Sequence, residues 1–310
     1  MTKLLTVFGA TGQQGGSLID YVLKNNELSK MFRIRGITRD TSKPSAVVLK
    51  GRGVEMVEAN LDKPATLTAA LGGSYAVFGV TNYWERALKE VEVAQGKAIA
   101  DASVAAGAEL LIWSSLPSVI RISKGKAAFK HFDSKAEVED YIRKLPVMGV
   151  FFMAGWYMQN HIGFMRPQAV GDGTYVLSQT FAPTATLPMI DITDTGKFIT
   201  PILLNPTKYN GNNFTCATKF LTPLQLVEGW TKVTGRTVTY SMISPDEIVS
   251  EAMTPEMRAE LKKSADLINE YSYFGPTGLA DMEWTQAQVK EELTTWEEFV
   301  KANEPWFEDM

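Results

Sequence analysis

Three glycines spaced three residues apart, Gly9, Gly12 and Gly15, follow a short apolar run at residues 4–8. An apolar run of this length is typical of a buried parallel strand. After the glycines, apolar residues recur with helical period at positions 18, 19, 22 and 23. A glycine turn between a strand and a helix lets backbone N–H groups approach a pyrophosphate at the positive end of the helix. This segment therefore predicts a dinucleotide-binding site.

The spacing of the motif is G-x-x-G-x-x-G, which differs from the G-x-G-x-x-G of many dehydrogenases. Glycine-rich turns also join strands to helices in proteins that bind no ligand there. The motif alone leaves that alternative open, and the flanking strand and helix patterns favour the nucleotide.

Residues 32–39 alternate apolar and polar side chains and predict a second strand that ends at Arg39. In dinucleotide folds an acidic residue at this end favours NAD, whereas a basic residue accommodates the 2′-phosphate of NADP. Lys43 follows four residues later and Asp40 is adjacent, so both signs of charge are present. Because arginine can pair with a phosphate through two hydrogen bonds, the sequence favours NADP. The alternative is that Arg39 is an ordinary surface charge.

Strands and helices alternate through the first half of the chain. This order predicts an α/β fold, a Rossmann-like doubly wound parallel sheet with right-handed crossovers. Further strands are expected at residues 54–62, 75–81, 110–115 and 147–152, and helices at 66–71, 85–106 and 129–143. Ligands bind at the carboxyl edge of such sheets, to which these strands deliver Asn60, Leu61, Thr81, Asn82, Ser114 and Ser115.

The alternation loosens in the second half of the chain. We expect a nucleotide-binding domain at residues 1–155 and a smaller α/β lobe at 156–310 that is largely helical towards its end. The stretch 174–188, rich in proline at its end, is expected to be an irregular excursion. A segment near 187–204 then returns to a strand followed by a helix, which we expect to belong with the first domain.

The composition excludes several classes of function. Lysine and arginine number 31 and aspartate and glutamate 35, so a net charge of −4 favours neither nucleic acid nor a membrane surface as a partner. The two histidines and one cysteine have no metal-ligand spacing, and no G-x-S-x-G nucleophile elbow occurs. We therefore expect no metal. The expected partner is a small-molecule substrate or a regulated protein, and the oligomeric state stays open.

The single cysteine, Cys216, fits a reducing compartment and lies in a strand-like context typical of a buried, inert thiol. No apolar run approaches the roughly 20 residues of a membrane span. The chain starts directly with the first predicted strand, so we expect no signal peptide. These features predict a soluble protein of the cytoplasm, with the nucleus as a second location.

The assembled motifs resemble the NmrA-like family of atypical short-chain dehydrogenase/reductase-like proteins, and within it the redox-sensor branch. The resemblance covers nearly the whole chain and rests on residues 9–15, 38–39, 81–85 and 131–141, which read GATGQQG, TR, TNYWE and HFDSKAEVEDY. It implies a Rossmann-like domain that binds NADP(H) and a smaller lobe that forms a cleft with it.

The same resemblance implies which residues meet each part of the cofactor. Arg39 would contact the 2′-phosphate, and Asn60 and Leu61 would lie on the adenine side. The diphosphate would be contacted by Gly9, Ala10, Thr11, Gly12, Gln13 and Gln14. The nicotinamide half would be surrounded by Thr81, Asn82, Lys135, Trp156, Tyr157, Met158 and Gln159.

Ordinary short-chain reductases carry a Tyr-x-x-x-Lys helix, in which the lysine binds the nicotinamide ribose and lowers the tyrosine pKa so that the phenol donates a proton. Here Lys135 holds the lysine position and His131 the tyrosine position, four residues apart on one helical face. One interpretation is that the chemistry has been lost and the protein senses the NADPH/NADP⁺ state. The other is an NADPH-dependent reductase of a small carbonyl, enone, quinone or imine, with His131 as proton donor and Ser114 or Ser115 holding the substrate oxygen.

Several residues near this helix keep alternative roles. His131 is also compatible with an ordinary helix surface, and His161 is expected to be structural. Tyr83 and Tyr157 are further candidate proton donors, although neither has a lysine at the right helical spacing. The bulky aromatic residues expected nearby either wall the cleft or pack in the core: Trp84, Trp156 and Tyr157. On balance the sequence favours the sensor.

Overall fold

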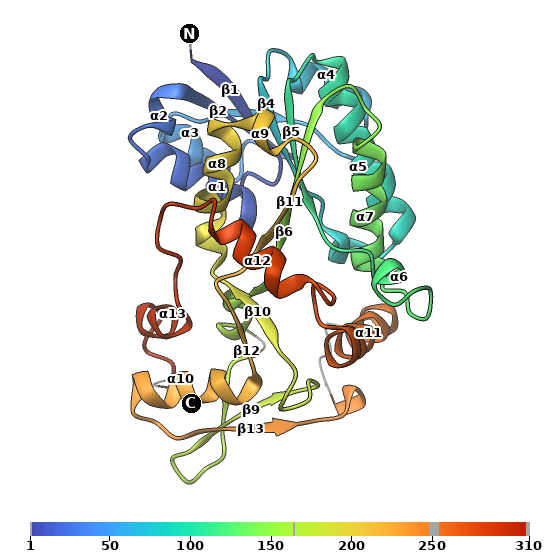
Figure 1. Ribbon diagram of the computed structural model, residues 1–310. Coiled ribbons are helices and arrows are strands. Elements are labelled where there is room, and N and C mark those ends of the chain that lie inside the picture. The colour runs from blue at the N-terminus through green and yellow to red at the C-terminus, as the bar shows by residue number, and fades with distance from the viewer. Residues whose placement is uncertain (1, 164, 248–253, 308–310) are drawn as a thin grey trace.

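A parallel sheet of seven strands forms the larger part of the molecule (Figure 1). The computed structural model describes residues 2–163, 165–247 and 254–307. The strands are β1 (Lys3–Val7), β2 (Phe32–Thr38), β3 (Glu55–Glu58), β4 (Ala76–Gly79), β5 (Leu110–Ser115), β6 (Met148–Ala154) and β11 (Asn213–Cys216). Their order is β11-β6-β5-β4-β1-β2-β3, and every neighbouring pair is parallel. The predicted doubly wound α/β fold is confirmed.

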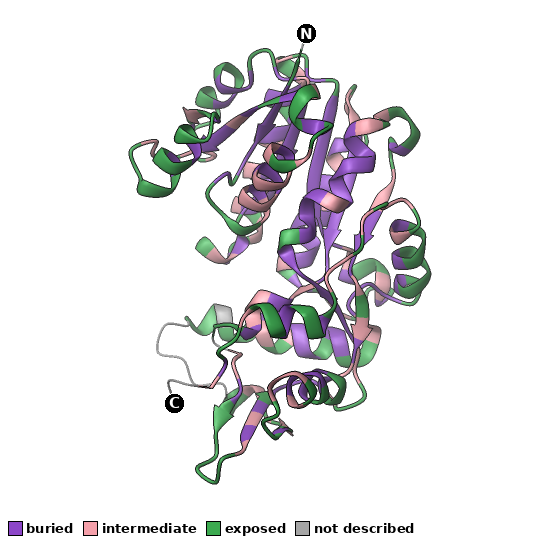
Figure 2. Cartoon of the chain, turned by 90° about the vertical axis from the view of Figure 1, so that its left-hand side faces the viewer, coloured by how far each residue is buried: buried purple, intermediate pink, exposed green. Residues whose placement is uncertain are grey.

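Helices cover both faces of this sheet. They are α1 (Gln13–Lys24), α2 (Leu28–Met31), α3 (Pro44–Gly51), α4 (Ala65–Leu71), α5 (Lys89–Ala105), α6 (Val119–Ile122), α7 (Lys130–Ile142), α8 (Thr195–Leu204) and α9 (Pro206–Tyr209). Leu110 and Ile112 of β5 join an apolar cluster with α1 and α8, whereas Leu111 and Trp113 join a second cluster with α4, α5 and α7. Figure 2 shows the central strands buried between more exposed helices. Buried strands therefore read as continuous apolar runs.

A smaller lobe lies at the carboxyl edge of the large sheet (Figure 1). Its two three-stranded sheets run β12 (Lys219–Leu221), β10 (Leu187–Ile190), β7 (Trp156–Tyr157) and β13 (Val238–Met242), β9 (Tyr175–Gln179), β8 (Gln168–Ala169). Its helices are α10 (Pro223–Thr234), α11 (Pro255–Tyr271) and α13 (Trp296–Ala302), and α12 (Gly278–Gln286) lies between the lobe and the large sheet. The described residues of the whole chain also form short 3₁₀ helices: η1 (Tyr83–Glu85) after β4, η2 (Met158–His161), η3 (Ile192–Asp194) and η4 (Pro245–Glu247). A core built around Trp230, Trp296 and Trp306 holds the lobe together.

The chain passes more than once between the two parts. Beyond residue 155, α8 packs against α1, β11 adds the last strand to the large sheet, and α12 packs on β11. The segment near 187–204 is thus divided between the two parts: β10 belongs to a sheet of the lobe, and α8 packs on the large sheet.

Two expectations about local structure are wrong. The stretch 174–188 is not wholly irregular, because it contains β9 and the start of β10. Pro188 lies opposite Phe220 of β12, and the pairing of β10 with β7 begins one residue later, at Met189. The helix expected from residue 85 begins at Lys89, because residues 83–85 form η1 and Ala87 adopts a positive φ of 52°.

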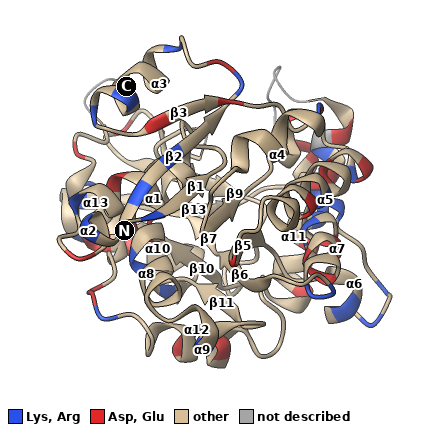
Figure 3. Ribbon diagram, turned by 90° about the horizontal axis from the view of Figure 1, so that it is seen from above, with Lys and Arg blue, Asp and Glu red and all other residues tan. Residues whose placement is uncertain are grey.

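Charged residues of both signs are interspersed around the periphery of the fold, as Figure 3 shows from above. In the described part of the chain, every helix is too short or too polar to cross a membrane. Cys216 is fully buried in β11, and burial raises the pKa of its thiol well above the usual value. The prediction of a buried thiol is confirmed.

Candidate functional site

The glycine turn joins β1 to α1 at the carboxyl edge of the sheet, between β4 and β2. Gly9 has a φ of +61°, a left-handed conformation that favours glycine. A Cβ on Gly15 would lie 2.4 Å from the carbonyl oxygen of Gly9 and 2.7 Å from that of Phe8. Only glycine therefore lets the first turn of α1 pack this closely against the end of β1. The N-terminus of α1 faces the point where the strand order reverses, which is where ligands bind in such sheets.

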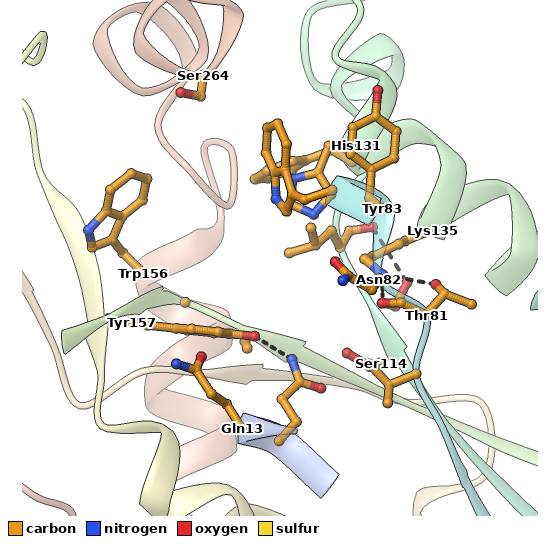
Figure 4. A pocket seen from close by; sticks show the side chains of 18 of the residues that line it. Gln13, Thr81, Asn82, Tyr83, Ser114, His131, Lys135, Trp156, Tyr157 and Ser264 are labelled. Carbon is orange, nitrogen blue, oxygen red and sulfur yellow. Dashed lines mark hydrogen bonds between the residues drawn. The ribbon is translucent and has the colours of Figure 1, made fainter. Parts of the chain in front are cut away.

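A cavity of about 630 Å³ opens between this turn and the lobe (Figure 4). Large aromatic and aliphatic side chains form most of its wall. Of the predicted site residues, it brings together Gly9, Gly12, Gln13, Gln14, Gly15, Thr81, Asn82, His131, Lys135, Trp156 and Tyr157. The glycine turn, the end of β4, α7 and β7 thus meet around one space.

Other predicted residues do not line this cavity. Ala10 is buried beneath the turn, and Thr11 is exposed. The side chain of Met158 packs in the lobe core. Gln159 donates to Asp191 Oδ1 at 2.7 Å and accepts from the backbone N–H of Ile192 at 3.1 Å, so both ends of its amide hold the lobe together.

The predicted adenosine-side residues lie at the ends of β2 and β3, outside the cavity. Arg39 follows β2 and forms an ion pair with Glu85 of η1. Lys43 is exposed at the N-terminus of α3. Asn60 accepts a hydrogen bond from the backbone of Asp62, and Leu61 packs at the edge of the apolar cluster beside α4. These residues border an open corner of the carboxyl edge.

Lys135 belongs to a buried polar cluster. Its Nζ lies 2.8 Å from Glu92 Oε1 and donates to the hydroxyl of Thr81 at 3.2 Å and the carbonyl of Thr81 at 3.3 Å. The Thr81 hydroxyl and the Ser134 hydroxyl both donate to the Glu92 carboxylate. Burial opposes ionisation of Glu92, but the Lys135 ammonium lowers the pKa of the carboxyl overall. The three acceptors match the three N–H bonds of Lys135, so its charge and donors are already satisfied.

His131 lies one helical turn before Lys135 and faces the cavity (Figure 4). Its half-buried ring is surrounded by the rings of Tyr83, Trp84, Phe129 and Phe132, with centroids 5.0–5.7 Å away. Burial, and then the positive charge of Lys135, lower the pKa of His131 to about 3. The imidazole is therefore neutral at pH 7 and is not a ready proton donor.

Further polar groups reach the cavity. Gln14 donates a hydrogen bond to the hydroxyl of Tyr157, which joins the first turn of α1 to β7 (Figure 4). The Ser115 hydroxyl donates to Glu139 at 2.6 Å and is occupied. Within the described residues the Ser114 hydroxyl has no hydrogen-bond partner, so Ser114 rather than Ser115 is available to a ligand.

The sequence analysis missed two parts of this site. Glu92 looks like any acidic residue near a helix start, and nothing in its spacing indicates the buried lysine on α7. The far wall of the cavity comes from α11 and the turn after it, with Leu261, Ser264, Leu267, Ile268 and Tyr273. The apolar period of α11 predicts a buried face, but it does not say which cavity that face borders.

The remaining titratable residues give no metal site. Among the described residues, no group of three His, Cys, Asp or Glu side chains is placed to hold a metal ion. His161 is buried between the rings of Trp230 and Trp296, and burial lowers its pKa to about 4. Its expected structural role agrees with this position.

Comparisons with known proteins identify the family of this chain and relatives of its fold. The family model described as NmrA-like family matches residues 1–300. An NmrA-like family domain-containing protein of Dictyostelium discoideum is 29% identical over 309 residues, covering 97% of this chain and 98% of that protein. An NmrA-like family domain-containing oxidoreductase of Aspergillus campestris is 32% identical over 259 residues, covering 76% of this chain and 74% of that one. The crystal structure of NmrA, a negative transcriptional regulator, in complex with NADP superposes with a TM-score of 0.82 at 23% identity, covering 98% and 95% of the two chains.

Proposed function

Because this chain belongs to the NmrA-like family, we propose that it binds NADP(H) at the carboxyl edge of its sheet and acts as a sensor of the NADPH/NADP⁺ state. The close approach of Gly15 to the Gly9 carbonyl carries the binding proposal, because this packing leaves the N-terminus of α1 open to a diphosphate. The related structure of NmrA contains NADP in the same fold.

The residues at this edge fit such a cofactor. Besides the glycine turn, the buried amide oxygen of Gln14 lacks a hydrogen-bond partner among the described residues, and Gln14 lies in the cavity wall; this oxygen would accept from a hydroxyl or amide N–H of the cofactor and not from its diphosphate. In this proposal Arg39 and Lys43 face the 2′-phosphate, and Asn60 and Leu61 the adenine. The nicotinamide half lies among Thr81, Asn82, Trp156 and Tyr157.

The state of Lys135 and His131 favours the sensor over an enzyme of the usual short-chain type. Lys135 has all three N–H bonds occupied by Glu92 and Thr81, so it lacks a free donor with which to tune a neighbouring acid. His131 is neutral at pH 7. A sensor needs only that NADPH and NADP⁺ favour two conformations differently, and the Gln14–Tyr157 hydrogen bond links the nucleotide turn to the lobe.

One observation supports a second candidate function, an NADP-dependent oxidoreductase. The cavity continues past the glycine turn to the apolar wall of α11, where a second small molecule fits beside the nicotinamide position. Bound NADPH would supply a hydride. Ser114 would hold the oxygen of an uncharged carbonyl, enone or quinone, or the nitrogen of an imine, and His131 is the nearest candidate to move a proton. The related Aspergillus protein is called an oxidoreductase.

A direct titration of the purified protein with NADPH, run beside NADPH oxidation with a panel of aldehydes, ketones, enones, quinones and imines, tests both functions. Tight binding without turnover supports the sensor. Turnover that His131→Gln abolishes establishes a reductase with an unusual proton donor, whereas turnover that survives this change excludes the histidine. Absence of NADPH binding contradicts both functions.

A further inference from the structure

Arg39, which is expected to hold the 2′-phosphate, is paired with a carboxylate, which is unusual for a phosphate-binding arginine. Arg39 Nη1 lies 2.5 Å from Glu85 Oε1, and both side chains are largely exposed. Glu85 comes from η1, which follows β4, whereas Arg39 follows β2. The ion pair therefore spans the carboxyl edge across β1 and its glycine turn.

Glu85 is held in this place by its neighbours. Arg86, the next residue, forms an ion pair with Asp62 after β3, and Gln95 of α5 donates to the same carboxylate at 2.9 Å. On the other side of Glu85, the buried Tyr83 donates to the carbonyl of Ala87 at 3.1 Å. These contacts anchor the backbone of residues 83–87 beside the ends of β2 and β3, where the adenosine half of the cofactor is expected, so Glu85 is kept within reach of Arg39.

The charges of this corner cancel. Arg39 and Lys43 contribute two positive charges, and Asp40 and Glu85 contribute two negative ones. Hydrogen bonds from the hydroxyl and backbone N–H of Ser42 lower the pKa of Asp40, so it is ionised at neutral pH. A corner that only favoured NADP would be expected to carry a net positive charge, because the 2′-phosphate is its distinguishing group.

We propose that Glu85 is a specificity-determining residue, which competes with the 2′-phosphate for Arg39 and so limits the preference of the site for NADP(H) over NAD(H). This inference rests on the proposed function. Before a phosphate pairs fully with Arg39, the Nη1–Glu85 contact must loosen or the phosphate must lie beside a like charge. NAD(H) has no phosphate at this position and is exempt from both effects.

The test is Glu85→Gln, which keeps the shape of the side chain and removes its charge. We expect the Glu85→Gln variant to bind NADPH about threefold to tenfold tighter than the wild type does, as measured by calorimetric titration. This gain is in the range of one exposed ion pair. NADH should change by less than about twofold, and the gain for NADPH should shrink at high salt because exposed charges are screened.

The matched control is Glu55→Gln. Glu55 pairs with Arg33 and Arg35 at the amino end of β3, away from the carboxyl edge, so the same change in net charge should leave both affinities unaltered. An equal gain for both nucleotides, or weaker NADPH binding because Glu85 orients Arg39, would overturn the inference while leaving the proposed function intact. A wild type that binds neither nucleotide would overturn both.

Discussion

Lys135 and Glu92 form an ion pair in which both side chains are less than a tenth exposed, with Nζ 2.8 Å from Oε1. The pair joins α7 to α5, and through the Thr81 hydroxyl and carbonyl it fixes the loop after β4. In the helical pattern used by short-chain reductases, the lysine approaches the cofactor as a free cation. Here the charge of Lys135 is neutralised by Glu92 inside the protein, so the main role of Lys135 is to hold Thr81, and with it the adjacent Asn82, in position.

Glu92→Gln should destabilise the fold, because it leaves the buried Lys135 ammonium without a counter-charge. We expect the free energy of unfolding to fall by about 3 kcal/mol in urea denaturation. The matched control is Glu137→Gln, which removes an exposed partner of Lys89 and Lys97 at the same pair of helices and should cost less than about 1 kcal/mol. Equal losses in the two variants would contradict a special role for Glu92.

Lys135→Ala should weaken NADPH binding whether or not the protein is an enzyme. The substitution removes both hydrogen bonds that Lys135 donates to Thr81, so the loop that would border the nicotinamide is held only by the bond from the Thr81 hydroxyl to Glu92. We expect a loss of about tenfold in affinity by fluorescence titration, a little over 1 kcal/mol, with circular dichroism confirming that the variant is folded. Lys97→Ala on α5, which breaks an exposed ion pair, is the control. Unchanged affinity in folded Lys135→Ala would remove Lys135 from the site.

Stability should decrease as the pH falls from 7 to 5. Burial holds the pKa of His131 at about 3 and that of His161 at about 4, below the usual histidine value of 6.5. At a pH between its folded and its unfolded pKa, each histidine takes up a proton in the unfolded chain but not in the folded chain. Lowering the pH therefore favours unfolding by at most about 1.4 kcal/mol per pH unit for each histidine. The carboxyl of Glu92, whose folded pKa is lowered, adds stability that is lost only at still lower pH.

Urea denaturation between pH 5 and pH 7 measures this dependence. His131→Gln should flatten the pH dependence of stability, because it removes one of the two histidines whose folded pKa is lowered. His131 is half-buried at the cavity, so its replacement leaves the lobe core intact. A slope equal to that of the wild type would mean that His131 titrates normally in the folded protein, and His131 would then regain its place as a candidate proton donor.

NADPH should bind about tenfold tighter than NADH or better, because Arg39 and Lys43 lie where the 2′-phosphate is expected. Arg39→Ala should reduce this ratio towards one by weakening NADPH binding alone. Arg33→Ala, which removes an arginine from the amino end of the same strand, should leave the ratio unchanged. Equal affinities for the two nucleotides in the wild type would contradict the assignment of Arg39 to the phosphate.

The sequence was sufficient for the features that depend on local patterns. Apolar runs separated by helical periods predicted the sheet, and the i, i+4 relation brought His131 and Lys135 to one face of α7, where both border the cavity. The features that it did not predict depend on pairs distant in the chain. Glu92 meets Lys135 across 43 residues, and Arg39 meets Glu85 across 46. A charged residue in a sequence carries no sign of its partner, so such pairs become visible only when the fold is known.

Gly15→Ala tests the nucleotide site at its narrowest contact. The added Cβ would lie 2.4 Å from the Gly9 carbonyl oxygen, a backbone atom that cannot turn away, so α1 must shift from the glycine turn. We expect NADPH and NADH binding to be lost together, with a decrease of about 2 kcal/mol in stability. Gly16→Ala is the matched control, since its nearest neighbour, the Ala10 carbonyl oxygen, would lie at 3.4 Å. Within the helix this control should keep both affinities and gain up to about 1 kcal/mol. If Gly15→Ala binds both nucleotides as the wild type does, the diphosphate does not rest on this turn.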